Sequence, residues 1–457
     1  MADEFDLAVL GGGTGGYTAA IRASQLGLHT VIVEEAKLGG TCLHLGCIPT
    51  KALLESSHLY HLVSRRGEEF GVIAAAVGHD YARIAARRDS IVAQLHRGVQ
   101  GLMKKNRIEV IEGPGEVVER GVLEVNGRRV AAPNLIVATG SLPRELPGAP
   151  FDGRRVVSSD HAVTAAELPE SIAIIGAGAV GVEFATFFNQ MGSKVTLIEA
   201  FDRLVPLEDT DISRELLDQF QRRGIDCRLE ARVQGVRVSK RGVSVDLGDD
   251  TVSAERVLIA VGRSPRSGGI GLDRIGVELA ANGFVKVDEW MRTNVPGVHA
   301  IGDVAGGYLL AHAAAHEGIV AAEDIADQRV VPMDQELVTR CTYSQPEIAS
   351  VGITEAQAGE RGIEVRSGRF PFAANGRALI HGEPGGFAKV IRDAQTGQLL
   401  GAHVIGTQAT ELIAEAALTR LFQGDAWELG RNIHPHPTLS EAIGEAALAA
   451  DSAPINF

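Results

Sequence analysis

One pattern occurs twice in the sequence and restricts the possible folds more than any other feature. A short apolar strand leads into a glycine-rich turn, then a helix, then a second apolar strand that ends in an acidic residue. The glycines keep the spacing G-x-G-x-x-G in both copies, at Gly11, Gly13 and Gly16 and again at Gly176, Gly178 and Gly181. In a dinucleotide-binding β-α-β unit they form the tight turn, let the backbone approach the pyrophosphate and let the helix pack on the strand. The sequence therefore predicts two nucleotide sites on one chain.

The acidic residues that end the second strands indicate which nucleotide fits. Glu34 holds this position in the first copy and Glu199 in the second. A carboxylate there accepts a hydrogen bond from a free ribose 2′-hydroxyl, whereas a 2′-phosphate is repelled and usually requires an arginine. Arg203 follows nearby, but Glu199 occupies the decisive position. The second site is therefore predicted to bind NAD rather than NADP.

The chain length of 457 residues predicts about three domains at roughly 150 residues each. Two similar apolar strands, residues 134–140 and 256–262, each end in a small residue and glycine, and proline-containing crossings follow them. Beyond residue 335, alternating stretches with a turn at Thr396 and Gly397 indicate antiparallel strands with helices around them. We therefore predict an α/β chain divided into 1–145, 146–264, 265–335 and 336–457.

The charge balance disfavours two classes of partner. Lys and Arg number 44 against 58 Asp and Glu, which gives a net charge of −14. Such a field repels nucleic acid and anionic membrane surfaces, while it permits a basic protein partner. No apolar run reaches the roughly 18 residues of a membrane-spanning helix, and the beginning of the sequence lacks a basic signal region. We expect a cytoplasmic protein without nucleic-acid or membrane partners.

Two of the four cysteines lie close together, in the segment GGTCLHLGCIPTK over residues 39–51. Cys42 and Cys47 are five apart, so a disulfide between them requires a distorted first helical turn, which Gly46 and Pro49 can supply. Lys51 follows Cys47 on the same helix face, where its charge can stabilise a thiolate or a reduced flavin. The pair is interpreted as redox-active, with buried structural cysteines or half a metal site as the alternatives. No second pair completes a zinc site, so no metal is predicted.

The segment NIHPHPTLSE, residues 432–441, contains the other candidate catalytic group. It holds His434, His436 and Glu441. A carboxylate can orient an imidazole and raise its basicity, which is what a general base requires. The residues alone leave this interpretation open against a satisfied structural histidine.

Taken together, these segments resemble the class I pyridine nucleotide–disulfide oxidoreductases over essentially the whole chain. The motifs that carry the resemblance are GGTCLHLGCIPTK, GAGAVGVE with Glu199, AIGDVAG, FPFAANGRA and HPHPTLSE. The resemblance implies two Rossmann-like domains, for FAD (1–145) and NAD (146–264), and a segment that completes the FAD site (265–335). It also implies an α+β dimerisation domain (336–457) and a functional homodimer.

The resemblance also implies roles for individual residues. Cys42 resembles the interchange sulfur that attacks substrate, and Cys47 the charge-transfer sulfur beside the flavin. His436 resembles the general base, oriented by Glu441 and supplied by the other subunit. The implied FAD contacts are Gly11, Gly13, Gly16, Glu34, Gly40, Thr41, Lys51, Gly115, Asp303 and Ala311. The implied NAD contacts are Gly178, Gly181, Glu199, Val233 and Gly262, and Lys51 is expected to pair with Glu183.

The implied reaction is oxidation of protein-bound dihydrolipoamide to lipoamide by NAD⁺, through a Cys42–Cys47 disulfide and FAD. The implied partner is a lipoyl-bearing acyltransferase of a 2-oxo acid dehydrogenase complex, or the lipoyl carrier protein of glycine cleavage. The departures from the family pattern are His44-Leu45 between the cysteines and Gln345 where a histidine is frequent. Neither touches the implied catalytic set.

Several other functions compete with this interpretation. A glutathione reductase would prefer NADP and carry an arginine pair near Glu199, and a mercuric reductase needs a further cysteine pair near its C-terminus. NADH oxidases of the wider group use one cysteine. A flavin-fold scaffold without turnover would have no use for the cysteine pair together with His436 and Glu441.

Overall fold

The computed structural model describes residues 3–74 and 76–456, and the chain forms two compact units. Each unit is assembled from three separate stretches of chain. The first comprises the chain up to Leu53, Ala82–Arg144 and Gly262–Gln335. The second comprises Leu54–Tyr81, Glu145–Val261 and the chain from Glu336 onward. The four-part division predicted above stays a prediction.

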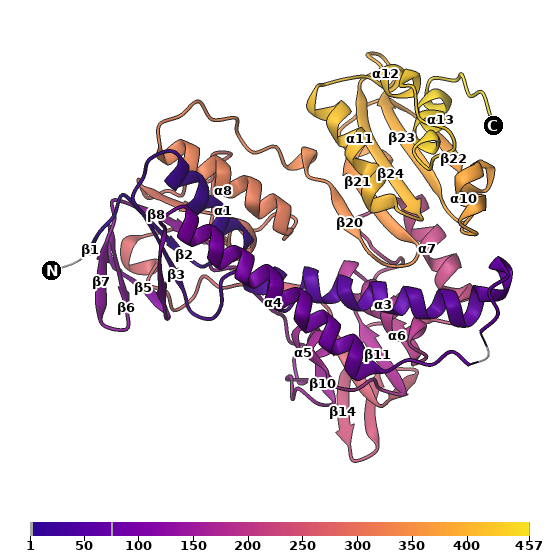
Figure 1. Ribbon diagram of the computed structural model, residues 1–457, viewed down its shortest axis with the longest axis horizontal. Coiled ribbons are helices and arrows are strands. Elements are labelled where there is room, and N and C mark those ends of the chain that lie inside the picture. The colour runs from indigo at the N-terminus through magenta and orange to yellow at the C-terminus, as the bar shows by residue number, and fades with distance from the viewer. Residues whose placement is uncertain (1–2, 75, 457) are drawn as a thin grey trace. The chain divides into compact units, whose positions relative to one another are not determined.

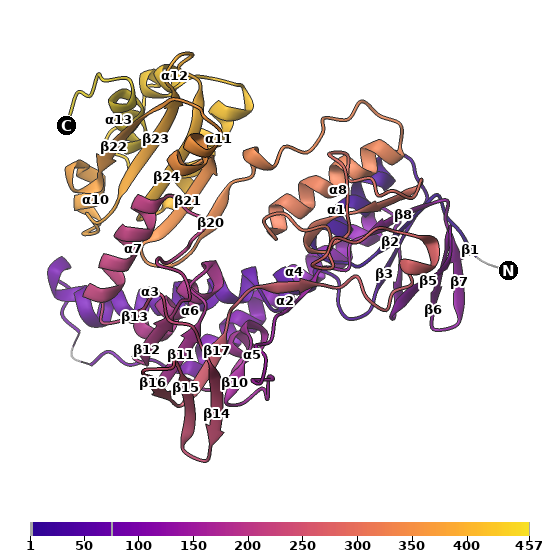
Figure 2. The same ribbon diagram turned by 180° about the vertical axis from the view of Figure 1, so that it is seen from behind.

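A parallel sheet forms the centre of the first unit. Its strands, in spatial order, are β19 (Val298–Ala300), β8 (Asn134–Val137), β2 (Leu7–Leu10), β3 (Thr30–Glu34) and β4 (Glu109–Glu112). Helices α1 (Thr14–Gln25) and α8 (Ala311–Ile325) lie side by side in both views (Figures 1 and 2). They approach closely because small residues face each other: a Cβ added at Gly318 would lie 2.7 Å from the Gly15 carbonyl oxygen.

The remaining elements of the first unit extend this core. A second sheet has the order β1 (Asp3–Glu4), β7 (Arg128–Ala131), β6 (Val122–Val125) and β5 (Gly115–Glu119). Strands β9 (Ser141–Pro143) and β18 (Arg263–Pro265) pair with each other. The helices are α2 (Gly40–His44), the first turns of α3 (Cys47–Arg66), α4 (Tyr81–Lys105), and the short η2 (Asp273–Ile275) and η3 (Gly302–Val304).

The second unit repeats the parallel arrangement. Its sheet has the order β10 (Val156–Val157), β17 (Arg256–Ile259), β11 (Ser171–Ile175), β12 (Lys194–Ile198) and β13 (Asp226–Arg228). The associated helices are α5 (Ser159–Thr164), α6 (Ala179–Gln190) and α7 (Thr210–Arg222). Helix α6 is buried almost all round, from Gly181 to Phe188. A small antiparallel sheet of β14 (Gly235–Ser239), β15 (Gly242–Asp246) and β16 (Thr251–Ala254) follows.

An antiparallel sheet from the last third of the chain completes the second unit. Its order is β20 (Arg340–Thr342), β21 (Glu347–Gly352), β24 (Leu399–Gly406), β23 (Phe387–Asp393) and β22 (Val365–Pro371). The predicted turn at Thr396 and Gly397 joins β23 to β24. The helices are α9 (Glu355–Glu360), α10 (Gly376–Ile380), α11 (Ala409–Leu421), α12 (Ala426–Arg431) and α13 (Glu441–Ala450). Short 3-10 turns are η1 (Gly67–Phe70), η4 (Gln335–Leu337) and η5 (Phe372–Ala374).

The predicted fold class is confirmed: two parallel α/β sheets with an antiparallel α+β region. None of the helices formed by the described residues has the length and apolar character needed to cross a membrane.

Candidate active site and nucleotide sites

The first glycine-rich turn joins β2 to α1, and two of its glycines are required by steric constraints. Gly11 has φ +109°, and an added Cβ would lie 2.3 Å from the Ala138 carbonyl oxygen. A Cβ on Gly16 would lie 1.9 Å from the Gly11 carbonyl oxygen, so the helix could not pack on the strand. Gly13 is different, because a Cβ there meets no atom within 4 Å. The turn therefore leaves open space at the N-terminus of α1, where the helix dipole favours a pyrophosphate.

Glu34 at the end of β3 holds this turn in place. Its two carboxylate oxygens accept hydrogen bonds from the amide N–H of Gly12, at 2.6 Å, and of Ala36, at 2.8 Å. The side chain is therefore positioned at the mouth of the turn, as the sequence predicts for a group that contacts ribose.

The other predicted FAD contacts are distributed around the same sheet. Gly40 has φ +56°, and a Cβ there would lie 2.7 Å from the Gly13 Cα, so the start of α2 touches the glycine turn. Thr41 follows it in α2. Gly115 begins β5, and a Cβ there would lie 2.5 Å from the Leu10 Cδ1. Ala311 is the first residue of α8.

Asp303 lies in a polar group that sequence reasoning did not find. Its carboxylate accepts a hydrogen bond from the Ser141 hydroxyl and lies 3.6 Å from the Arg263 Nε. Ser141 and Arg263 come from the paired strands β9 and β18. These features, with the open space at Gly13, fit FAD along this sheet edge.

The two cysteines occupy a break between helices, as the predicted distortion requires. Cys42 lies in α2, which ends at His44, and Cys47 is the first residue of α3. Gly46 keeps the break compact, because a Cβ there would lie 3.0 Å from the Thr41 carbonyl oxygen. The side chains of the two cysteines lie in hydrogen-bond contact. Two sulfurs in this arrangement can exchange between a dithiol and a disulfide.

The surroundings of Cys42 favour its thiolate. The hydrogen bond with Cys47 is the main cause that lowers the pKa of Cys42 to about 7. Burial opposes this shift, while the Thr14 hydroxyl and the positive charge of Lys51 reinforce it. Cys227 shows the opposite behaviour, because burial raises the pKa of its thiol to about 12.

This contrast predicts which cysteine of the dithiol enzyme reacts with iodoacetamide. Below a pH of about 7 the alkylation rate of Cys42 should rise roughly tenfold per pH unit, and above it the rate should level off. Lys51→Met should move the plateau to higher pH, because the charge that stabilises the thiolate is lost. Peptide mapping after timed alkylation measures both effects, with Cys227 as the unreactive control. A Cys42 rate that keeps rising through pH 9, roughly as a thiol with ordinary pKa does, would contradict this account.

The second glycine-rich turn resembles the first at each of its three glycines and at its acidic residue. Gly176 has φ +99° and a Cβ there would lie 2.4 Å from the Ala260 carbonyl oxygen. A Cβ on Gly181 would lie 1.9 Å from the Gly176 carbonyl oxygen, whereas one on Gly178 meets nothing within 4 Å. Glu199 accepts from the amide N–H of Ala177 at 2.6 Å and of Phe201 at 3.1 Å. The second unit therefore offers the same open, acid-flanked turn, which fits NAD.

Other residues predicted around the second turn are placed as follows. Val233 is half-buried against the core of this unit. Gly262 has φ +106° directly after Val261, where the chain passes into the first unit. Glu183 is buried in α6, and its Oε1 accepts from the Tyr343 amide N–H at 2.9 Å. Lys51 belongs to the first unit and Glu183 to the second, so their pairing stays a prediction.

His436 and Glu441 form the predicted imidazole–carboxylate pair. The His436 Nδ1 lies 2.8 Å from the Glu441 Oε1, and 79 % of the His436 side chain is exposed. Burial alone would raise the pKa of Glu441, but hydrogen bonds from the Thr438 amide and from His436 hold that pKa below its ordinary value. The carboxylate therefore stays charged and orients the ring, while the Nε2 points to a solvent-accessible side with no protein hydrogen bond among the described residues.

His434 has the structural role that the residues alone left open. Its Nε2 lies 2.8 Å from the Glu415 Oε1, and only 8 % of the side chain is exposed. The hydrogen bond with Glu415 raises the pKa of His434, against the effect of burial. Gly444 packs on the ring, since a Cβ there would lie 2.7 Å from the His434 Cε1.

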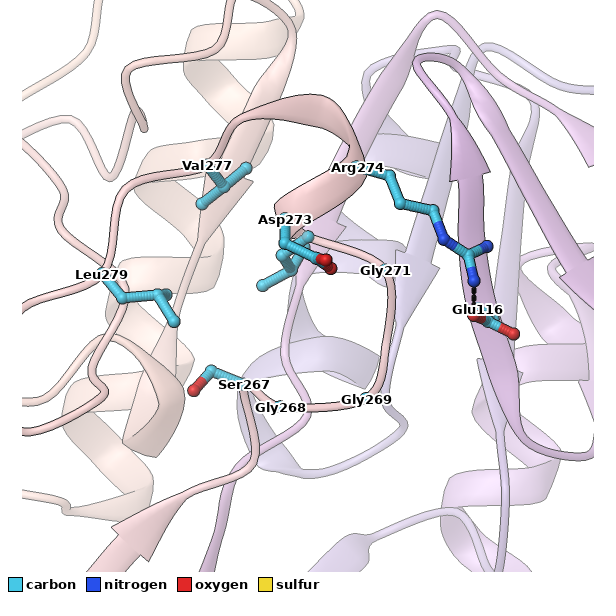
Figure 3. A pocket seen from close by; sticks show the side chains of 10 residues that line it. Glu116, Ser267, Gly268, Gly269, Gly271, Asp273, Arg274, Val277 and Leu279 are labelled. Carbon is cyan, nitrogen blue, oxygen red and sulfur yellow. Dashed lines mark ion pairs between the residues drawn. The ribbon is translucent and has the colours of Figure 1, made fainter.

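A cavity in the first unit, of about 370 Å³, also escaped sequence reasoning (Figure 3). The loop from Ser267 to Gly271 forms one wall, and an ion pair between Arg274 and Glu116 closes the other. Gly271 holds the loop against β5, because a Cβ there would lie 2.0 Å from the Val117 carbonyl oxygen. The sequence signal is the glycine pair at 268–269, which ends the segment 262–269 that the sequence predicts only as a domain crossing.

Comparison with known proteins gives the same result over the whole chain. The family model for pyridine nucleotide-disulphide oxidoreductases matches residues 5–318, and the model for their dimerisation domain matches residues 338–447. The chain is 45% identical to a dihydrolipoyl dehydrogenase of Bacillus subtilis, with 100% of each chain covered. It is 43% identical to one of Chlorobaculum tepidum, with 98% of each covered. The crystal structure of LpdA from Mycobacterium tuberculosis superposes with a TM-score of 0.90 at 28% identity, over 98% of this chain and 99% of that one.

Proposed function

The chain belongs to the pyridine nucleotide-disulphide oxidoreductases, and we propose from this membership and the site geometry a specific mechanism for its reaction. It acts as a dihydrolipoyl dehydrogenase that uses FAD and NAD. The observation that carries the mechanism is the break between α2 and α3, which holds Cys42 and Cys47 in hydrogen-bond contact.

The reaction is a thiol–disulfide exchange followed by electron transfer. The enzyme begins with a Cys42–Cys47 disulfide, and a thiolate of the dihydrolipoyl group attacks the Cys42 sulfur. The bond between the two cysteines breaks, Cys47 leaves as a thiolate, and a mixed disulfide remains on Cys42. The second substrate thiolate then attacks its own neighbouring sulfur, closes the lipoyl ring and releases Cys42. Two electrons and two protons have then passed from substrate to the enzyme dithiol.

His436 supplies the base that this exchange needs. Substrate thiols near pH 7 are mostly protonated, and only a thiolate attacks a disulfide efficiently. The His436 Nε2 takes the proton, while Glu441 at the Nδ1 fixes the tautomer and stabilises the imidazolium. We propose that this pair comes from the other subunit of the homodimer, which the dimerisation domain supports.

The cofactors complete the electron path. When bound, FAD would supply the two-electron chemistry that links the Cys42–Cys47 dithiol to NAD⁺. The residues that would hold FAD are the turn at Gly11–Gly16, Glu34, the start of α2, Asp303 and the N-terminus of α8. The residues that would hold NAD are the turn at Gly176–Gly181 and Glu199. Lys51, next to the cysteines, holds positive charge beside the forming thiolate.

The choice of NAD over NADP tests this assignment against that of a glutathione reductase. We expect dihydrolipoamide oxidation to run with NAD⁺ and hardly with NADP⁺, because Glu199 repels a 2′-phosphate. Glu199→Gln should lower the ratio of kcat/KM with NAD⁺ to kcat/KM with NADP⁺ by roughly tenfold to a hundredfold. The exposed Glu170→Gln, on the same unit, is the matched control and should keep the wild-type ratio. Turnover of glutathione disulfide with NADPH in place of dihydrolipoamide would refute the assignment.

The physiological substrate carrier is proposed to be a lipoyl-bearing acyltransferase of a 2-oxo acid dehydrogenase complex or the glycine-cleavage lipoyl carrier protein, in the cytoplasm. The name of the relatives and the net charge of −14, which suits a basic docking segment, support this. Retention of lipoyl-bearing host proteins on the immobilised enzyme tests it, and retention of none would contradict it.

A further inference from the structure

A cavity of about 300 Å³ lies entirely within the second unit and contains none of the residues discussed above for catalysis or nucleotide binding. Its walls come from five stretches far apart in the sequence: the end of α3, the end of α7, the loops at 345–346 and 382–385, and Thr407. The polar side chains that line it are His61, Arg66, Gln219, Arg223, Gln345, Glu383 and Thr407. Cationic groups therefore outnumber the single carboxylate in the wall.

That carboxylate is already engaged. The Glu383 Oε1 accepts hydrogen bonds from the Gln345 Nε2 at 2.6 Å and from the Arg66 Nη1 at 3.2 Å. Arg66 also donates to the Gly382 carbonyl oxygen at 2.6 Å and to Glu69. The ion-pair partner of Glu383 in the wall is thus Arg66, and Glu383 acts on Arg223 only through its charge, without an ion pair among the described residues.

Arg223 is the second arginine of the cavity wall. Its Nη1 donates to the Gln345 carbonyl oxygen at 2.6 Å, and no carboxylate among the described residues forms an ion pair with it. Burial lowers the pKa of Arg223 to about 10; the charge of Glu383 opposes this shift, and the charge of Arg66 reinforces it. A carbonyl oxygen satisfies one of the five donors of a guanidinium. A cation removed from water in this way is costly unless an anion compensates it.

The other groups around the cavity reinforce the positive field. His61 has a lowered pKa, first because it is buried and then because Arg223, His58, Arg66 and Arg65 surround it. The neutral imidazole still carries one N–H donor. The loop from Gly382 to Gly385 packs against α7, since a Cβ on Gly385 would lie 2.5 Å from the Gln219 Nε2.

We propose that this cavity is a binding site for a small oxyanion of the phosphate class, with Arg223 as its principal contact. A guanidinium presents paired N–H groups that match two oxygens of a phosphate, which explains an arginine rather than a lysine here. The volume equals that of about ten liquid water molecules at roughly 30 Å³ each. It therefore accommodates inorganic phosphate or the phosphate group of a small monoester, which share this chemistry.

The proposal is tested by calorimetric titration of the FAD-loaded full chain with inorganic phosphate. Saturating NAD⁺ is present to block the nucleotide site. We expect saturable binding to the wild type. Arg223→Gln should weaken it by roughly tenfold to a hundredfold, the effect of losing a charged hydrogen bond. Arg222→Gln removes the same charge from an exposed neighbour and should bind like the wild type. A parallel titration with glycerol phosphate distinguishes the sources: tighter binding than inorganic phosphate indicates a monoester ligand.

A second variant keeps the test decisive if Arg223→Gln does not fold. Glu383→Gln removes the one negative charge of the wall, so phosphate binding should become roughly threefold to tenfold tighter. Three outcomes would overturn the proposal: no saturable binding to the wild type, equal binding by the folded Arg223→Gln and Arg222→Gln variants, or no gain in affinity in Glu383→Gln.

Discussion

Replacement of Cys47 by serine is expected to reduce dihydrolipoamide oxidation by roughly a thousandfold or more while FAD remains bound. Without Cys47 no disulfide forms, so Cys42 offers substrate no sulfur with a leaving group. Cys42→Ser and the double variant should lose the same amount, because the two sulfurs act as one unit and their effects are not additive. Steady-state turnover, with the flavin content of each variant measured by visible absorbance, checks this expectation.

Cys227→Ser provides the matched control for these variants. Its thiol hydrogen-bonds the Ile225 carbonyl oxygen, and burial raises its pKa to about 12, so it takes no part in exchange. We expect its turnover to match the wild type. Near-normal turnover in Cys47→Ser would show that substrate electrons reach FAD without the cysteine pair.

The second large effect is expected at His436. His436→Gln should lower kcat by roughly 10²–10⁴-fold, the usual contribution of a general base. The melting temperature should remain that of the wild type, because 79 % of the side chain is exposed. Raising the pH toward the pKa of the substrate thiols should restore part of the rate, since the substrate then ionises without a base. Turnover and the melting temperature are measured on the same preparations, so that a loss of catalysis is distinguished from a loss of stability.

His434→Gln, two residues away, is the matched control. It should lower the stability and leave turnover unchanged, the opposite of what is expected for His436→Gln. The buried His434–Glu415 hydrogen bond is lost, which costs about 1.5–3 kcal/mol of unfolding free energy, while turnover stays close to normal. Because the folded-state pKa of His434 is raised, its stabilising effect is fully present below roughly pH 6.5, the unfolded value. The effect is lost as the pH rises through the folded-state pKa. If His434→Gln abolished turnover and His436→Gln did not, the two roles would be interchanged.

The nucleotide turns could be predicted because their requirements are local. Gly16 avoids a clash with the carbonyl oxygen of Gly11, five positions earlier in the same β-α-β unit, and Gly11 itself has a φ of +109° that favours glycine. The fold class followed from this repetition and from the alternation of apolar residues in the last third of the chain. The break between Cys42 and Cys47 could likewise be anticipated from Gly46 and Pro49.

Groups that converge from distant segments could not be predicted. Ser141, Arg263 and Asp303 meet only because two strands, β9 and β18, pair across more than a hundred intervening residues. From the sequence, Gln345 is expected only to be a departure from the family pattern outside the catalytic set. The structure instead places its side chain within hydrogen-bond reach of His58 and Glu383. No periodicity in the sequence encodes such contacts, since each depends on the completed sheet.

Thiol counting on the unfolded protein addresses the redox pair itself. Of the four cysteines, only Cys227 and Cys341 should react in enzyme denatured directly after exposure to air, because Cys42 and Cys47 are then joined. After NADH is added to the FAD-loaded enzyme under nitrogen, all four should react. If all four thiols already react in the air-exposed enzyme, and lipoamide turnover is intact, then the electrons reach the flavin by another route.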